Sequence, residues 1–396
     1  MINNIDKMKN RVLWIDYLRS SIILLVVAHH SALAYTTFAK FNKEAYILST
    51  HPIVDIQKWI GLDIFVFFND IFFMSLMFFI SGVFVLASLQ KKGSLSFLRD
   101  RFNRLFIPFM FGVTILMLIA YYPSYYLAHG QSNIKDYIID FFTIEHWPVG
   151  PPWFIWVLFL FNLVLALVFP FIKGLLNKLS ELLLAFRNKP LTMLFIWFLF
   201  TWIIYVPMRL LFGPDSWTGL GPFDFQKSRL LLYFGYFIFG AVIGNTSFEK
   251  GLFSDDSAFM KKWPTWITLC VLTFLLLLAI DGPFRRLIAT KQMDVLYTQL
   301  IYSIVYVSFC TFSCIAFLTS FKALVKSSRF WMDSLVANSF SIYLIHYIFI
   351  LWCQYVLLSF NFPAIIKFGI TFWVVLSFSW LVSYLIRKNN IVKKYL

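Results

Sequence analysis

The chain of 396 residues is 60% hydrophobic and 21% aromatic, only 13% of its residues are charged, and its formal net charge is +15. Its mean hydropathy of +0.76 and its repeated apolar stretches of about 20 residues exclude a soluble protein. The stretches are continuous rather than alternating, which excludes a β-barrel, and the basic residues lie in short segments between them, so no nucleic-acid partner is expected.

The sequence predicts an all-α polytopic membrane protein of about ten transmembrane helices, with no attached soluble domain. Lys and Arg number 22 at the ends of the spans that share a side with both termini and 11 at the opposite ends, which predicts that both termini are cytoplasmic. No small-residue cleavage site follows the first span, so we expect residues 1–396 to form one transmembrane domain. The predicted spans are 16–37, 62–89, 105–127, 152–172, 191–212, 229–247, 264–281, 298–320, 335–358 and 364–386.

The first span, IDYLRSSIILLVVAHHSALAY, contains an arginine and two histidines. Eleven helical residues bring His30 back to within about 20° of Arg19, about 16 Å further along the axis. Ionisable groups are costly inside a membrane, and a neutral imidazole there can take a proton from a hydroxyl. His29 points about 80° away and is expected to pack. The alternative for His30 is a stabilising hydrogen bond between helices.

Two further charged segments follow. Asp70, inside the second span, needs a partner, and a histidine at similar depth would have its tautomer fixed by this carboxylate. In SFLRDRFNRLFIPF, Arg101 and Arg104 are three residues apart and are expected to share one helix face. Arginine forks suit phosphate oxygens, although ordinary anchoring of a cytoplasmic loop also explains two arginines here.

The four cysteines lie within apolar runs, so we expect no disulfide and no metal site. A polar stripe of Ser339, Tyr343 and His346 marks the ninth span, NSFSIYLIHYIFILW. If that helix starts near Leu335, then His346 lies about as deep as His30, which predicts a cavity shared by the two histidines. A cluster of hydrogen bonds between helices is the alternative.

Five segments in order resemble acyltransferase family 3, the bacterial multi-span membrane O-acyltransferases, and in particular its glucan biosynthesis protein C-like branch. Each is short, but together they extend from the first span to the ninth and so cover essentially the whole chain. The segments are DYLRSSIILLVVAHHS, FFISGVF, LRDRFNRLFIPF, GPPWFIWVLFLF and SFSIYLIHYIF.

The resemblance implies that His30 is the catalytic histidine and that Arg19, Arg101 and Arg104 bind acyl-coenzyme A, a co-substrate rather than a permanently bound cofactor. Members of the family move acyl groups, for example in O-acetylation, from cytoplasmic acyl-coenzyme A to glycans or lipid-linked sugars outside the bacterial cytoplasmic membrane. Ser339, Tyr343, His346 and Asp70 are then supporting residues. Some relatives carry a C-terminal hydrolase-like domain, so here the membrane domain or a glycan-assembly partner is expected to handle the acceptor.

Two other functions remain compatible with the residues. Buried His, Asp and Arg also occur in proton-coupled transporters, so an exporter of an anionic or glycan substrate is an alternative. A non-catalytic scaffold of a glycan-assembly complex is another. The sequence leaves open whether the acyl group is acetyl or succinyl, and which acceptor receives it.

Overall fold

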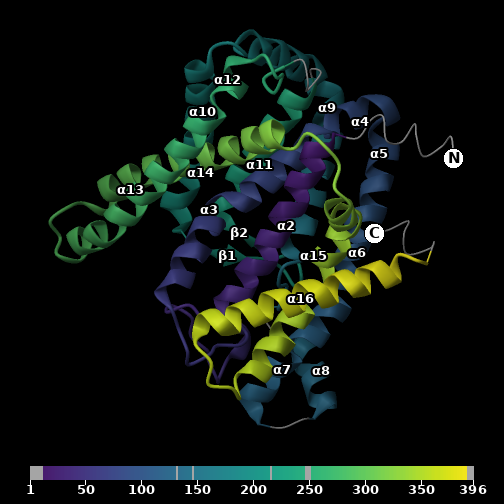
Figure 1. Ribbon diagram of the computed structural model, residues 1–396, viewed down its shortest axis with the longest axis vertical. Coiled ribbons are helices and arrows are strands. Elements are labelled where there is room, and N and C mark those ends of the chain that lie inside the picture. The colour runs from purple at the N-terminus through teal and green to yellow at the C-terminus, as the bar shows by residue number, and fades with distance from the viewer. Residues whose placement is uncertain (1–11, 131–132, 145–146, 215, 246–250, 390–396) are drawn as a thin grey trace.

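The computed structural model describes residues 12–130, 133–144, 147–214, 216–245 and 251–389, and these form one helical bundle (Figure 1). One short antiparallel pair of strands, with Trp217 opposite Gln226, is present within these residues. The helices are α2 Leu13–Leu33, α3 Ile60–Val83, α4 Val85–Lys92, α5 Ser94–Arg101, α6 Ile107–Phe111, α7 Met117–His129, α8 Ile134–Thr143, α9 Trp153–Ala185, α10 Pro190–Phe212, α11 Lys227–Asn245, α12 Ala258–Lys261, α13 Trp263–Ala289, α14 Val295–Leu324, α15 Phe330–Leu357 and α16 Ala364–Ile386; the strands are β1 Trp217–Thr218 and β2 Phe225–Gln226.

Nine helical segments of the described chain are long and apolar enough to cross a membrane, which confirms an all-α, multi-pass membrane protein. The helix of the first predicted span, α2, is not among the nine. Its Asp16, Arg19, His29 and His30 lower its hydropathy. Since α2 packs against α3, α14, α15 and α16 in the centre of the bundle, it does not need an apolar surface all round (Figure 1).

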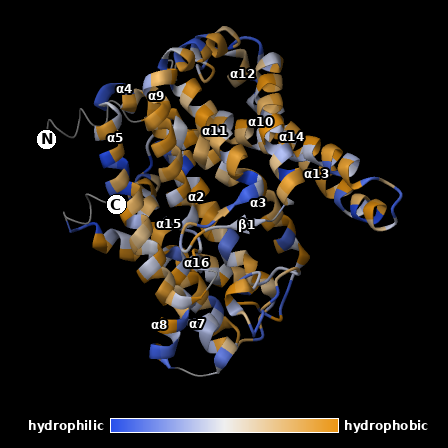
Figure 2. Ribbon diagram, turned by 180° about the vertical axis from the view of Figure 1, so that it is seen from behind, coloured by the Kyte–Doolittle hydropathy of each residue, from blue (hydrophilic) through white to orange (hydrophobic). Residues whose placement is uncertain are grey.

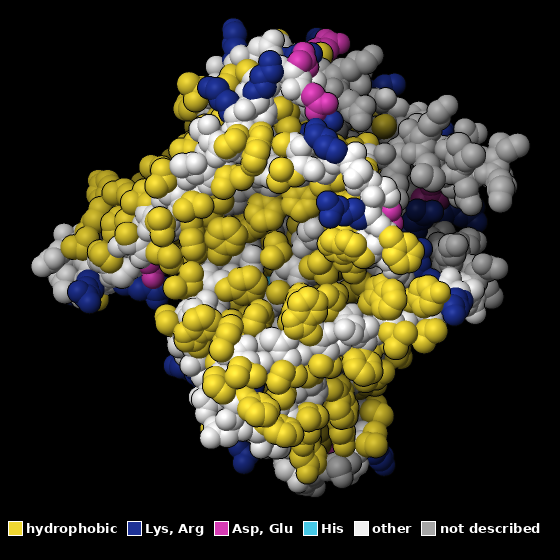
Figure 3. Space-filling view, in the orientation of Figure 1, with side chains coloured by type: hydrophobic (Ala, Val, Ile, Leu, Met, Phe, Trp, Pro, Cys, Tyr) yellow, Lys and Arg dark blue, Asp and Glu magenta, His cyan; other side chains and the backbone are white. Residues whose placement is uncertain are grey.

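The outer surface of the bundle is apolar. Orange helices cover most of the view in Figure 2, and hydrophobic side chains cover most of the face in Figure 3. The far end of the hairpin of α13 and α14 projects from the bundle in Figure 1, and large apolar side chains such as Val271, Leu275 and Ile301 are exposed on these two helices. Such a surface is stable against lipid chains rather than water.

Alternate helices run in opposite directions, so the bundle has two ends. We call the end where α2 begins and α16 finishes the terminal face. The loop face is the opposite end, where α2 finishes and where residues 34–59, α8 and the two strands lie. The arginine of the first span is near the terminal face, and its histidine pair is near the loop face.

Helices α3 and α11 form a close interface at the middle of the bundle. A Cβ atom on Gly240 would collide with the carbonyl oxygen of Phe79, and one on Gly244 would collide with that of Val83. Glycine at both positions therefore lets the two backbones touch, a common form of helix packing in membranes.

Candidate active site

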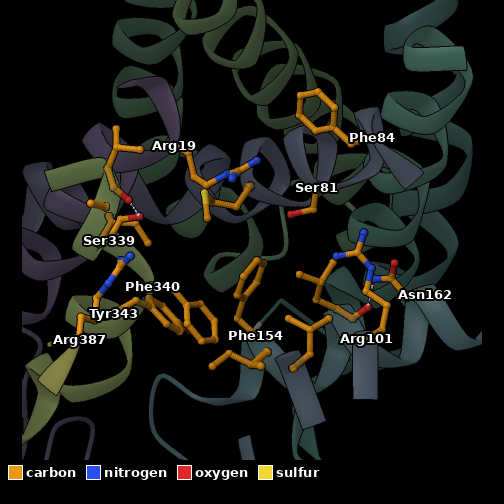
Figure 4. Close-up of a pocket in the computed structure, with 17 residues that line it drawn as sticks. Arg19, Ser81, Phe84, Arg101, Phe154, Asn162, Ser339, Phe340, Tyr343 and Arg387 are labelled. Carbon is orange, nitrogen blue, oxygen red and sulfur yellow. Dashed lines mark hydrogen bonds between the residues drawn. The ribbon is translucent and has the colours of Figure 1, made fainter. Parts of the chain in front are cut away.

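A cavity of about 500 Å³ opens at the terminal face and contains three arginines (Figure 4). Arg19 comes from α2, Arg101 from the last residue of α5, and Arg387 from just beyond the last turn of α16. Phe154, Phe340 and Tyr343 line the deeper part of the cavity. Arg19 and Arg101, two of the residues expected to bind acyl-coenzyme A, thus line one cavity. The cavity also contains Ser339 of the polar stripe.

None of the three guanidinium groups forms a salt bridge within the described residues, although the carboxylates of Asp16 and Asp100 act on Arg19 and Arg101 from a longer distance. Arg101 stacks on the ring of Phe97, with 4.8 Å between the guanidinium carbon and the ring centroid, and its buried Nε has no hydrogen-bond partner. Burial lowers the pKa of the Arg387 guanidinium. Three cations that converge without a paired carboxylate among the described residues favour the binding of a polyanion.

Arg104 does not join this cavity. It lies in a π-helical turn, Phe102–Phe106, which follows Arg101 directly, and its side chain is exposed. The expectation that Arg101 and Arg104 share a face assumes α-helical spacing. A π-helical turn contains more residues than an α-helical one, so three positions no longer return to the same face.

Further into the bundle, a chain of hydrogen bonds fixes the histidine of the first span. The Nδ1 atom of His346 lies 2.6 Å from the carbonyl oxygen of Tyr343, and its Nε2 atom lies 3.2 Å from Nδ1 of His30. A carbonyl only accepts, so Nδ1 of a neutral His346 carries the hydrogen and its Nε2 accepts from His30. His30 is then left with a free lone pair on Nε2, the state that a general base requires.

The backbone around His30 is held from the same helix, α15. Gln354 donates from Nε2 to the carbonyl oxygens of His30 and Ser31, and its Oε1 lies 2.8 Å from Nε2 of His51. His29 points elsewhere, as expected, and its ring packs on Phe73 at 5.1 Å. The two adjacent histidines therefore have different environments.

His30 faces a second cavity, of about 320 Å³, which opens at the loop face. Three tryptophans from separate segments line it: Trp147, Trp153 and Trp217. The polar groups on its walls include His51 and Asp224. A cavity with aromatic walls and few polar groups is typical of small-molecule and sugar sites.

One hydrogen bond links the walls of the two cavities. The Tyr343 side chain lines the terminal-face cavity, and its hydroxyl donates to the carbonyl oxygen of Pro151, which lines the loop-face cavity. The preceding Gly150 has φ +55°, and a Cβ there would meet the sulfur of Met117. Glycine at this position therefore permits the turn that presents the Pro151 carbonyl to Tyr343.

Asp70 lies in neither cavity. Its carboxylate pairs with Arg229 on α11 at 2.6 Å, whereas Nδ1 of His30 faces His346 instead of a carboxylate.

Sequence analysis missed Arg387, Trp217 and His51, since an arginine at a helix end and aromatic or polar residues in loops are ordinary there. Within the described chain, no group of three or more His, Cys, Asp or Glu side chains is placed to hold a metal ion.

A family model described as an acyltransferase domain matches residues 12–384 of the chain. None of the curated proteins and none of the solved structures that were compared matches it significantly. The matched range contains both cavities and the chain of hydrogen bonds between them.

Proposed function

Because the chain belongs to acyltransferase family 3, whose members transfer acyl groups other than aminoacyl groups, we propose that it moves an acyl group from acyl-coenzyme A to a hydroxyl of a glycan or lipid-linked sugar on the other side of the membrane. One observation supports this best: arginines with no salt bridge among the described residues line the mouth of one cavity, His30 faces another, and a hydrogen bond from Tyr343 links the walls of the two.

The terminal-face cavity suits the donor. Phosphates of the nucleotide end would bind Arg19, Arg101 and Arg387, because guanidinium groups pair with phosphate oxygens in a planar, two-bond geometry. Arg19 and His30 are about 16 Å apart along the α2 axis. The extended pantetheine arm would bridge that length and present the thioester beside Tyr343.

The loop-face cavity suits the acceptor. The tryptophans offer flat apolar surfaces for a sugar ring, and His51 and Asp224 offer polar contacts to its hydroxyls. Nε2 of His30 would take the proton of the attacking hydroxyl. As the new carbon–oxygen bond forms, the carbon–sulfur bond breaks, and the proton returns from His30 to the departing thiolate. Direct attack and an acyl-enzyme intermediate are both compatible with this placement.

We expect the Tyr343–Pro151 contact to open when donor and acceptor meet. The hydroxyl of Tyr343 would leave the Pro151 carbonyl when the thioester arrives and would then be free to donate to the thioester oxygen. Ser339 lies on the donor side, one turn before Tyr343, and His346 holds the His30 tautomer.

The biological setting belongs to the same proposal. The excess of Lys and Arg on the side of the termini supports a cytoplasmic terminal face, on the side of the membrane where acyl-coenzyme A is found. The protein would then act in the bacterial cytoplasmic membrane on cell-envelope polysaccharide, in the manner of the glucan biosynthesis protein C-like branch, with an acetyl or succinyl group and with or without a glycan-assembly partner.

The test uses membrane vesicles supplied with labelled acetyl- or succinyl-coenzyme A. We expect His30→Asn to lose acyl transfer, and the adjacent His29→Asn, matched in chemistry and depth, to retain most of it. Retention of near wild-type transfer by His30→Asn would overturn the proposal. Coenzyme A should also raise the unfolding temperature of the purified protein, which a carrier of unrelated substrates would not show.

A further inference from the structure

A third cavity, of about 410 Å³, lies between α3, α10, α11 and the α13–α14 hairpin, away from both cavities of the proposed reaction. Its lining includes Arg209 near the end of α10, Arg229 near the start of α11, and Tyr302 and Tyr306 in the first half of α14. These helix ends place it near the loop face. We propose that it binds a membrane lipid whose headgroup carries one net negative charge, on its phosphodiester.

The charges inside the cavity do not balance. Arg209 and Arg229 are both buried, and within the described residues Asp70 is the carboxylate that pairs with them, through Arg229 alone. Arg209 makes its hydrogen bonds to neutral groups, the Gln299 amide at 2.9 Å and the Tyr205 hydroxyl at 2.8 Å. An uncompensated buried cation is costly in a membrane protein, so a site with this composition favours an anion.

Tyr306 joins the two cations. The guanidinium carbons of Arg209 and Arg229 lie 5.7 Å and 5.8 Å from the centroid of its ring. Two buried polar atoms at this point, the Tyr306 hydroxyl and Nε of Arg229, have no hydrogen-bond partner within the described residues. Both residues line the cavity, so a phosphate oxygen there would accept from both donors.

The mouth of the cavity adds no net charge. Arg285 and Asp281 lie four residues apart on α13 and pair with each other at 3.0 Å, largely in the open. The described lining therefore holds three arginines against two aspartates. This excess of one positive charge matches a phosphodiester, which carries one negative charge, better than it matches a nucleotide or a polyphosphate.

An apolar groove provides a place for the lipid chain. It measures about 280 Å³ and is lined by α3, α13 and α14, with Val271 and Phe317 among its walls. On α13, Cys270 of the groove and Phe284 of the cavity are fourteen residues apart, as are Ala316 and Tyr302 on α14. Fourteen residues make four helical turns less about 40°, so the two residues of each pair lie on nearly the same side of their helix, about 21 Å apart along its axis.

The groove and the cavity therefore follow one stripe of the hairpin that faces α3. Phe67 lines the cavity and the adjacent Phe68 lines the groove, and both rings pack on Phe274 between them. The hairpin stands out into the region where lipid would lie (Figures 1 and 3). Tyr306 of the cavity and Ala316 of the groove are ten residues apart on α14, a rise of about 15 Å that matches the thickness of one hydrocarbon leaflet, so one chain can extend from the headgroup site into the groove.

The experiment measures lipid binding to the purified, delipidated full chain by native mass spectrometry and by the unfolding temperature. The probes are dioleoyl phosphatidylglycerol, the zwitterionic dioleoyl phosphatidylcholine, and glycerol 3-phosphate, which has no chain. We expect phosphatidylglycerol alone to stabilise the wild type. Arg209→Gln should weaken its binding about tenfold. Arg286→Gln removes a cation from the end of α13 that borders the cavity, but Arg286 does not line the cavity, so this variant should bind like the wild type.

A second variant separates binding from folding. Val271→Trp fills the apolar groove from an exposed position and leaves every charge in place, so it should also weaken phosphatidylglycerol binding. Equal binding by the Arg209→Gln variant and the wild type, or equal stabilisation by phosphatidylcholine or by glycerol 3-phosphate, would overturn the assignment. Acyl transfer is not the readout, so this result is independent of the proposed reaction.

Discussion

Nδ1 of His30 and Nε2 of His346 lie 3.2 Å apart, although 316 positions separate the two residues in the chain. The pair links the first helix of the bundle to the ninth predicted span, at the depth where the terminal-face and loop-face cavities approach each other. His346 touches neither cavity, so its proposed role is to position His30 rather than to contact substrate.

Replacing His346 should therefore lower turnover without weakening the binding of either substrate. His346→Leu removes the imidazole that faces Nδ1 of His30, and we expect kcat to fall about 10- to 100-fold with KM for acyl-coenzyme A unchanged. His346→Gln, which can still offer an oxygen to a hydrogen on that atom, should recover part of the loss. Steady-state transfer of labelled acyl groups measures both, and equal activity of the two variants would exclude the positioning role.

The two arginines of the LRDRFNR segment should behave differently. Arg101→Gln removes a half-buried cation from the terminal-face cavity, so we expect KM for acyl-coenzyme A to rise about tenfold. Arg104→Gln removes an exposed cation outside that cavity and should change KM little, like the exposed Arg99→Gln as a control. Initial rates at varied acyl-coenzyme A decide the matter. A large KM effect at Arg104 with none at Arg101 would contradict the placement.

How far the sequence predicts this site depends on the regularity of each helix. The α-helical rise alone places His30 and His346 at one depth, and the structure brings them into contact. The same arithmetic fails for Arg104, because the π-helical turn at Phe102–Phe106 has no signature that the spacing of apolar residues reveals. Asp70 was expected to fix the tautomer of a histidine at similar depth, but its carboxylate pairs with Arg229 instead. Arg229 lies at a helix end, where an arginine resembles an interface anchor.

The loops contribute what periodicity does not describe. Trp217 reaches the loop-face cavity from a two-residue strand, and Gly150 shapes the turn that holds Tyr343. Positions of this kind depend on tertiary contacts between segments far apart in the chain. Composition and hydropathy predict the membrane bundle, whereas the walls of the cavities require the fold.

The stability of the folded chain should fall in mild acid because of His51. Burial lowers the pKa of His51 to about 4, against the hydrogen bond to Gln354, which favours the charged form. The unfolded chain takes up this proton near pH 6.5, so the cost of folding grows as pH falls from 6.5 to 4 and is constant below. It amounts to about 3 kcal/mol at the lower limit. Unfolding temperatures between pH 8 and 4 measure the effect, and His51→Gln should lose less stability than the wild type over that range.

The last prediction concerns the acceptor. Trp217 is 46% exposed at the rim of the loop-face cavity, and its ring meets that of Trp153 edge to face at 5.5 Å. If a sugar lies against this pair, Trp217→Ala removes one wall and should raise KM for the acceptor about three- to tenfold. KM for acyl-coenzyme A should not change, because its proposed site is the terminal-face cavity, which Trp217 does not line. Trp373→Ala, which removes an exposed tryptophan from α16 away from both cavities, is the matched control. Equal acceptor KM values in the two variants would show that Trp217 does not contact the acceptor, and a rise in the donor KM alone would assign this cavity to acyl-coenzyme A.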